Sequence, residues 1–155
     1  MVKEYEFLMQ KCKSDSKVKS SLRDFGFAVT EIPWPDTAVK EIAKRNWPGE
    51  HGEDAYFPSM HGMEAYDLSV KFVYKGDLKT SYGAMKKLRE YLMGMDGDGT
   101  EMRVYDPYNG IGKAGVTLSK MTDREPHRTS LGDVLEMTVV FRVTSPVSEL
   151  TLNPE

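Results

Sequence analysis

Residues 133–144 read DVLEMTVVFRVT, and this stretch decides the fold class. Apolar and polar side chains alternate along it, as they do in a strand that buries one face, because successive side chains of a strand point to opposite faces. The apolar face carries Leu135, Met137, Val139, Phe141 and Val143, and the other face carries Glu136, Thr138 and Arg142. We therefore predict a half-buried strand in an antiparallel sheet.

Five other segments have features of strands. Ala65–Lys75 alternates almost as regularly, and Glu101–Asp106 and Gly112–Met121 alternate over shorter runs. Asp24–Ile32 is rich in aromatic and β-branched residues, which strands favour. Thr37–Arg45 is ambiguous, because its alternation of Lys and Glu with Val, Ile and Ala suits an exposed strand while its composition also tolerates a helix.

Asp77–Met93 has the periodicity of an α-helix. Asp77 or Thr80 can cap its first turn, and Gly94 stands where a left-handed residue commonly ends a helix. The apolar stripe of this helix, with a period of about 3.6 residues, consists of Leu78, Tyr82, Met85, Leu88 and Leu92. The expected order is β-β-(β)-β-α-β-β-β, an α+β domain whose mainly antiparallel sheet buries one face against a single helix.

Composition places the chain among single soluble domains. It has 155 residues, of which 39% are hydrophobic and 29% charged. The net charge of −3 gives no whole-domain basic field, so we expect no sequence-specific binding of nucleic acid. No apolar run approaches the ~20 residues that span a bilayer, so we expect no membrane association. The single cysteine, Cys12, excludes an internal disulfide and a multi-cysteine metal site.

The N-terminal part of the chain combines a short apolar run, Tyr5–Met9, with a polar stretch, Lys11–Ser21. We expect residues 1–21 to be partly flexible for this reason. The same part lacks the apolar h-region of a signal peptide, which predicts a reducing, cytosolic origin.

Residues 47–63 form the longest segment without periodicity, and its core reads PGEHGEDAYFPSMHG. Such a length without secondary structure is unusual in a compact domain and predicts a functional or partner-ordered loop. Aromatic side chains in this and other loop segments either fold back over the sheet or form a protein–protein interface, where Trp, Tyr and Met are enriched. These side chains are Trp34, Trp47, Tyr56, Phe57 and Tyr108.

No constellation of catalytic or metal-binding residues is apparent. His51 and His61 lie ten residues apart with Glu53 and Asp54 between them, but the ligand spacing of a metal site is missing. Cys12 is flanked by lysines, which favour the thiolate, but no histidine lies near it in the sequence. We therefore expect no cofactor, no resident metal and no enzymatic activity.

Two glycine-rich segments resemble ligand-binding loops only superficially. Met95–Glu101 reads MDGDGTE, but counting from Asp96 places Glu101 and Pro107 where a calcium loop needs glycine and glutamate. We predict a turn that leaves the helix. Residues 109–116, NGIGKAGV, fit neither phosphate-loop pattern and predict a hairpin connection instead.

The order of these features resembles the N-terminal domain of phage distal tail proteins. The segments that carry the resemblance are DFGFAVTEIPWP (24–35), KEIAKRNWPGEHGEDAYF (40–57), YDLSVKFVYKG (66–76), MKKLREYLMGMDGDGTEMRVYDP (85–107) and LEMTVVFRVTSP (135–146). Together they cover roughly residues 22–147. Pro48, Gly49 and Gly52 occupy the Pro-Gly-x-x-Gly loop of the family.

The resemblance implies a β-sandwich or split barrel with one flanking helix, related to the tail-tube fold. It implies a single domain over residues 1–155, from which a β-hairpin arm extends at about Thr37–Tyr74. Six copies would form a ring around the tail channel, with each arm packing on a neighbour. Distal tail proteins usually carry a second domain, and we expect this chain to hold the ring-forming domain alone.

The function implied is that of a non-enzymatic structural component of a phage or prophage tail. Its partners would be further copies of itself and other tail components, and it would be assembled in the bacterial host cytoplasm into the virion tail. Two alternatives stay open, namely a small metal-dependent enzyme that uses the His51–His61 loop and a monomeric protein-binding module. The candidate subunit-interface residues are Trp34, Trp47, Pro48, Gly49, Tyr56 and Phe57.

Overall fold

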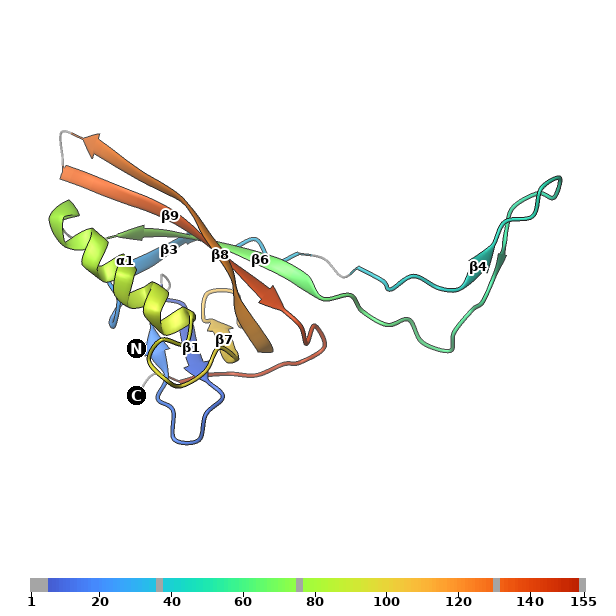
Figure 1. The fold of residues 1–155 in the computed structure, drawn as a ribbon, viewed down its shortest axis with the longest axis horizontal. Coiled ribbons are helices and arrows are strands. Elements are labelled where there is room, and N and C mark those ends of the chain that lie inside the picture. Colours follow the sequence, from blue (N-terminus) through green and yellow to red (C-terminus); the bar gives the residue numbers. More distant parts are fainter. Residues whose placement is uncertain (1–5, 36–37, 75–76, 130–131, 154–155) are drawn as a thin grey trace.

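The computed structural model of the chain describes residues 6–35, 38–74, 77–129 and 132–153 (Figure 1). Within these ranges the elements are β1 (Leu8–Lys11), β2 (Lys19–Ser20), β3 (Phe27–Glu31), β4 (Lys44–Arg45), β5 (Asp54–Ala55), β6 (Tyr66–Tyr74), α1 (Leu78–Leu92), β7 (Met102–Asp106), β8 (Ile111–Thr129) and β9 (Gly132–Val143). Seven strands form one antiparallel sheet in the order β2-β1-β7-β8-β9-β6-β3. The strands β4 and β5 pair separately.

The strand predicted from residues 133–144 is β9, and it lies inside the sheet between β6 and β8. All five side chains of its predicted apolar face are buried. β6 pairs with it in continuous register, from Tyr66 opposite Val143 to Tyr74 opposite Leu135. The predicted bounds of β6, β7 and β9 are confirmed to within one residue.

The helix α1 has the predicted extent and caps, and it runs along one face of the sheet (Figure 1). The side chain of Asp77 accepts a hydrogen bond from the backbone N–H of Lys79 at 3.1 Å, which satisfies one of the free donors of the first turn. Gly94 follows the C-cap Met93 with a φ of 77°, the left-handed conformation expected there. The helical side chains buried against the sheet include Leu88, Tyr91 and Leu92.

The two outer strands of the curled sheet, β2 and β3, are linked at Ser21, which directly follows β2. The backbone N–H of Ser21 donates to the carbonyl of Phe7 at 2.9 Å, and the N–H of Phe27 donates to the carbonyl of Ser21 at 2.7 Å. The Ser21 hydroxyl also accepts from the N–H of Phe7 at 3.1 Å. Inside the curl, the centre of the Phe7 ring lies 6.3 Å from the ring centre of Phe72 in β6 and 5.5 Å from the ring centre of Phe141 in β9.

The architecture is thus a curled half-barrel of antiparallel strands with one helix, which confirms the predicted α+β class. Of the two forms expected, the split barrel describes it, because all seven strands of the body belong to one continuous sheet rather than to two facing sheets. No helix in the described ranges is long and apolar enough to cross a membrane.

The described part of the N-terminal segment, for which the sequence predicts a partly flexible stretch over residues 1–21, contains a buried strand. Residues 1–5 lie outside the described ranges, but Phe7, Leu8 and Met9 are fully buried. β1 pairs with β7 along its whole length, so the short apolar run becomes part of the core.

Two other elements differ from their expected extents. β8 continues past the predicted end at Met121 to Thr129, because its distal half pairs with β9 in a long hairpin. In the ambiguous segment Thr37–Arg45, Thr37 lies outside the described ranges and the rest is extended rather than helical. This segment contributes an isolated bridge from Val39 to Met63 and the short strand β4.

The glycine-rich segment after α1 is a turn, as predicted, and it is held by a buried lysine from β1. The ammonium of Lys11 donates to the carbonyls of Tyr91 and Gly99, and it lies 4.6 Å from the centre of the Tyr91 ring. It is also 3.9 Å from a carboxylate oxygen of Asp96. Burial lowers the pKa of Lys11, while Asp96 and Asp98 offset part of that effect.

The buried hydroxyl of Ser21, which accepts from the backbone N–H of Phe7, leads to a stability prediction for Ser21→Ala. We expect the free energy of unfolding to fall by about 1–3 kcal/mol, because the buried N–H of Phe7 loses its acceptor. Urea titration measures the change. Ser69→Ala, at an exposed position of β6, is the control, and equal stability of the two variants would contradict the role of Ser21.

The contacts of Lys11 with the turn after α1 lead to a second stability prediction, for Lys11→Met. We expect a loss of about 1–3 kcal/mol, since the buried carbonyl of Tyr91 and the partly buried carbonyl of Gly99 lose their donor. Faster amide hydrogen exchange over residues 94–99 should accompany it. The control is Lys13→Met, which breaks only the exposed pair with Asp98 (3.0 Å) and should cost no more than about 1 kcal/mol. A larger loss for Lys13→Met would contradict the assignment.

Candidate assembly interface

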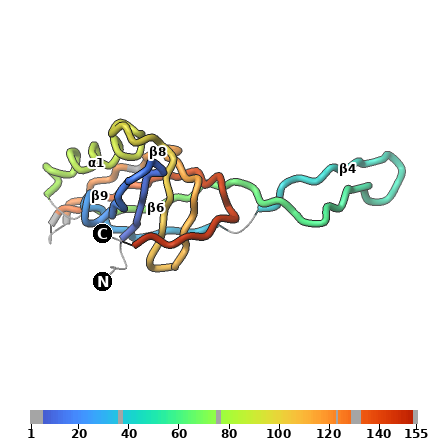
Figure 2. Tube along the Cα trace, turned by 90° about the horizontal axis from the view of Figure 1, so that it is seen from below, coloured from blue at the N-terminus to red at the C-terminus, as the bar shows by residue number. Residues whose placement is uncertain are grey.

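Residues 38–65 leave the sheet between β3 and β6 and form a long, narrow arm (Figures 1 and 2). Its two legs pair sparsely, through the bridge from Val39 to Met63, the strands β4 and β5 and a few further backbone hydrogen bonds. At about 3.3 Å per residue, legs of this length reach roughly 40 Å from the body. The arm is shorter than the expected Thr37–Tyr74, because Tyr66–Tyr74 is β6 and belongs to the sheet of the body.

The tip of the arm is organised around Trp47. Its indole N–H donates to a carboxylate oxygen of Asp54 at 2.9 Å, and the guanidinium of Arg45 lies 4.9 Å from the centre of the Trp47 ring. Gly49 and Gly52 have φ values of 83° and 75°, which side chains with a Cβ rarely adopt. The Pro-Gly-x-x-Gly sequence therefore makes the turn that reverses the chain.

Next to the tip, the returning leg exposes a run of large apolar side chains. Tyr56, Phe57 and Met60 are 66%, 82% and 81% exposed. Large exposed apolar groups that lie close together mark interaction surfaces more often than chance surface positions do. This run is therefore a candidate binding surface of the arm.

Trp34 has a different place from the other candidate residues. It lies at the base of the arm, packs against the core and donates its indole N–H to the carboxylate of Asp106 at 3.0 Å. Asp106 is buried and also accepts from the side chain of Asn109 at 2.6 Å and from the backbone of Tyr108 at 3.1 Å. The structure thus places Trp34 on the body. The other five candidates, Trp47, Pro48, Gly49, Tyr56 and Phe57, lie on the arm.

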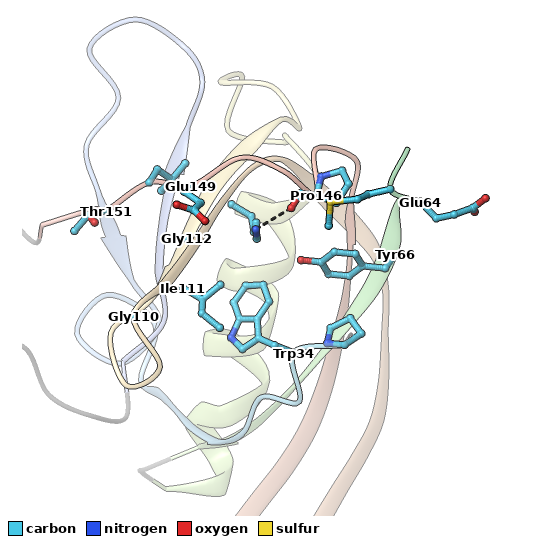
Figure 3. A pocket seen from close by; sticks show the side chains of 13 residues that line it. Trp34, Glu64, Tyr66, Gly110, Ile111, Gly112, Pro146, Glu149 and Thr151 are labelled. Atoms are coloured by element: carbon cyan, nitrogen blue, oxygen red, sulfur yellow. Dashed lines mark hydrogen bonds between the residues drawn. The ribbon is translucent and has the colours of Figure 1, made fainter. Parts of the chain in front are cut away.

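A pocket of about 540 Å³ opens at the base of the arm. The rings of Trp34 and Tyr66 line it together with Ile111 and the C-terminal segment 146–151 (Figure 3). The ammonium of Lys113, also in the lining, donates to the carbonyls of Pro146 and Ser148 at 2.9 and 3.0 Å. These two hydrogen bonds hold the C-terminal segment against β8, so the charge of Lys113 in this pocket has a structural role.

The two histidines of the alternative hypothesis of a metal-dependent enzyme, His51 and His61, do not form a ligand group. His51 lies at the tip and His61 on the returning leg, both exposed. Within the described ranges, the only group of three or more potential metal ligands is Glu125, His127 and Glu136. Glu125 and Glu136 face each other across the β8–β9 hairpin, and His127 Nε2 lies 3.8 and 3.6 Å from their carboxylates. No spacing in the sequence marks this cluster, because only the register of the β8–β9 hairpin brings its members together.

The environment of Cys12 does not favour a reactive thiolate. Burial raises the pKa of the Cys12 thiol, and the charge of Glu101 raises it further, while Arg103 acts in the opposite direction. The expectation that the flanking lysines favour the thiolate is therefore wrong. Gly110 lies in the turn between β7 and β8, which is the hairpin predicted for residues 109–116.

Comparison with known proteins locates the chain by its fold. No protein-family model and no curated protein matches it. The crystal structure of the Dit protein (gp 19.1) of phage SPP1, described as a paradigm of the hub adsorption apparatus in phages that infect Gram-positive bacteria, matches with a TM-score of 0.58 and 17% identity. The match covers 90% of this chain and 50% of the Dit chain. The tail of an empty GTA particle, determined with C6 symmetry, matches with a TM-score of 0.44 and 11% identity over 96% of both chains.

This chain therefore spans about half the length of the SPP1 Dit protein. The likeness to that structure confirms the fold that the resemblance to distal tail proteins implies: over nine-tenths of its length, the chain shares the fold of one half of a phage Dit protein.

Proposed function

We propose that this chain is a non-enzymatic structural component of a phage or prophage tail and that it assembles as a ring around the tail channel. The observation that carries the proposal is the arm, which holds Tyr56, Phe57 and Met60 in solvent away from the body. The body that bears this arm has the fold of half of the SPP1 Dit protein, which supports the same assignment.

The geometry of the arm permits a ring of head-to-tail contacts. The arm projects from one end of the body (Figure 2), so on a neighbour it would contact a surface different from itself. Such head-to-tail contacts generate rings when the rotation between copies closes. We propose six copies per ring, with other tail components as further partners, in keeping with the resemblance of the sequence to distal tail proteins.

The alternative of a metal-dependent enzyme has less support. His51 and His61 lie in different parts of the arm, and no third ligand joins either of them within the described ranges. The pocket at the base of the arm offers a lysine that is already bound to two carbonyl groups. The alternative of a monomeric binding module differs from the ring in oligomeric state and is decided by the experiment below.

Native mass spectrometry combined with negative-stain electron microscopy tests the proposal. We expect a hexamer and ring-shaped particles with a central channel at micromolar protein concentration. A strict monomer at high micromolar concentration, with no rings in the micrographs, would overturn the ring and favour the monomeric module.

Trp47→Ala tests whether the arm makes the contact between copies. We expect the concentration needed for half-assembly to rise at least tenfold, because the tip loses the side chain that binds Arg45 and Asp54. The unfolding midpoint of the body should not change, since the tip does not contact the core.

The control is Tyr108→Ala, which removes an exposed aromatic side chain from the turn between β7 and β8. Sedimentation velocity over a concentration series compares both variants with the natural sequence. Assembly that Trp47→Ala leaves unchanged would show that the arm is not the contact between copies.

A further inference from the structure

A groove of about 490 Å³ lies between α1 and the distal half of β8, and it belongs neither to the arm nor to the pocket at its base. Its apolar lining consists of Met85, Met93, Leu118, Met121 and Met137. Methionine side chains are flexible and polarizable, so a surface built from them adapts to an inserted aromatic or thioether group. The groove is therefore suited to binding an apolar segment of another protein.

Three cationic side chains line the groove beside the methionines, namely Arg89, Lys120 and Arg124. Within the part of the chain that the structure describes, none of these three charges takes part in an ion pair. A segment that carries carboxylates next to apolar side chains would match this combination of cations and methionines.

β8 also has an open edge where it borders the groove. It pairs with β7 only as far as Val116, and beyond that residue its one strand neighbour in the described sheet is β9. The unpaired backbone groups of such an edge can accept an extended segment as an additional strand. An extended occupant is therefore favoured over a helical one.

The returning leg of the arm has the matching properties. Tyr56, Phe57 and Met60 are its exposed apolar groups, and they are preceded by Glu53 and by Glu50 in the turn at the tip. Neither carboxylate forms an ion pair among the described residues. This leg thus presents negative charge next to exposed apolar groups, as the groove requires.

The arm of a chain does not reach the groove of the same chain. Figures 1 and 2 both show the arm extending away from the body on the side remote from α1, whereas α1 forms one wall of the groove. The contact must therefore join two copies, in which the arm of each copy fills the groove of the next.

We propose that the groove between α1 and β8 binds residues 50–60 of the arm of a neighbouring copy. Phe57 enters the methionine lining, and Glu50 and Glu53 lie against Arg89, Lys120 and Arg124. This proposal rests on the proposed ring, and it names the surface that receives the arm.

Photo-crosslinking identifies the partner surface directly. Phe57 is replaced by p-benzoylphenylalanine, which inserts into nearby C–H bonds on irradiation and reacts readily with methionine side chains. Assembly from a mixture of ¹⁴N- and ¹⁵N-labelled chains shows by mass spectrometry whether a crosslink joins two copies. We expect mixed-isotope crosslinks to Met85, Met93 or Met121.

The other crosslinking outcomes separate this proposal from the proposed function. Crosslinks between copies that map outside the groove would overturn the docking site and leave the ring standing. Crosslinks within one chain would overturn the docking between copies. A natural sequence that forms no ring and gives no crosslink between copies would overturn both proposals.

Charge reversal tests the same contact without a probe. We expect the pair Lys120→Glu and Arg124→Glu to raise the concentration for half-assembly at least tenfold, and the pair Glu50→Lys and Glu53→Lys to do the same. A chain with all four changes should regain most of the lost assembly, because the charges are again opposite. Failure of this rescue, when both pairs alone weaken assembly, would overturn the proposed contact.

A matched control has the same change in net charge away from the groove. Lys71→Glu together with Lys87→Glu alters exposed positions on β6 and α1 that do not line it. We expect assembly of this variant to stay within about twofold of the natural sequence. A loss equal to that of the groove variant would show that net charge, rather than the groove, controls assembly.

Discussion

The hydrogen bonds at Ser21 hold the two edges of the curled sheet together, and the rest of the structure depends on them. Ser21 is fully buried and links the chain at Phe7, next to β1, with Phe27 at the start of β3. This link joins the two edge regions of the sheet, and the side chains of β1, β6 and β9 pack in one common core inside the curl.

The order of the strands in the curled body also determines where the arm begins and ends. β3 and β6 are antiparallel neighbours, so the arm is the connection of a hairpin extended far beyond the length of an ordinary turn. Its legs leave the body side by side, and Trp34 bound to buried Asp106 fixes the outgoing leg at its base. The core is complete without the arm. The apolar groups of the arm are therefore free to contact another molecule without loss of the fold.

Much of this architecture was predictable because its signals are local. The alternation of residues 133–144 and the caps at Asp77 and Gly94 predicted β9 and α1 to within one residue. What the sequence could not show depends on contacts between distant segments. Lys11 belongs to a polar-looking stretch, yet it is buried because its ammonium binds carbonyl groups some 80 and 88 residues away. Of the candidate interface residues, the structure places Trp34 on the body and the other five on the arm.

The groove between α1 and β8 also depends on contacts between distant segments. Some methionines fill the core, and others line this groove. Met9 and Met102 fill the core, whereas Met85 and Met121 come from a helix and a strand and meet only in the folded chain. No sequence pattern marks such a surface. The arm and the groove lie at different ends of one body. The arm of a single copy therefore cannot cover the groove of that same copy. If the arm of each copy fills the groove of the next, as proposed, closure of a ring leaves no arm and no groove unfilled.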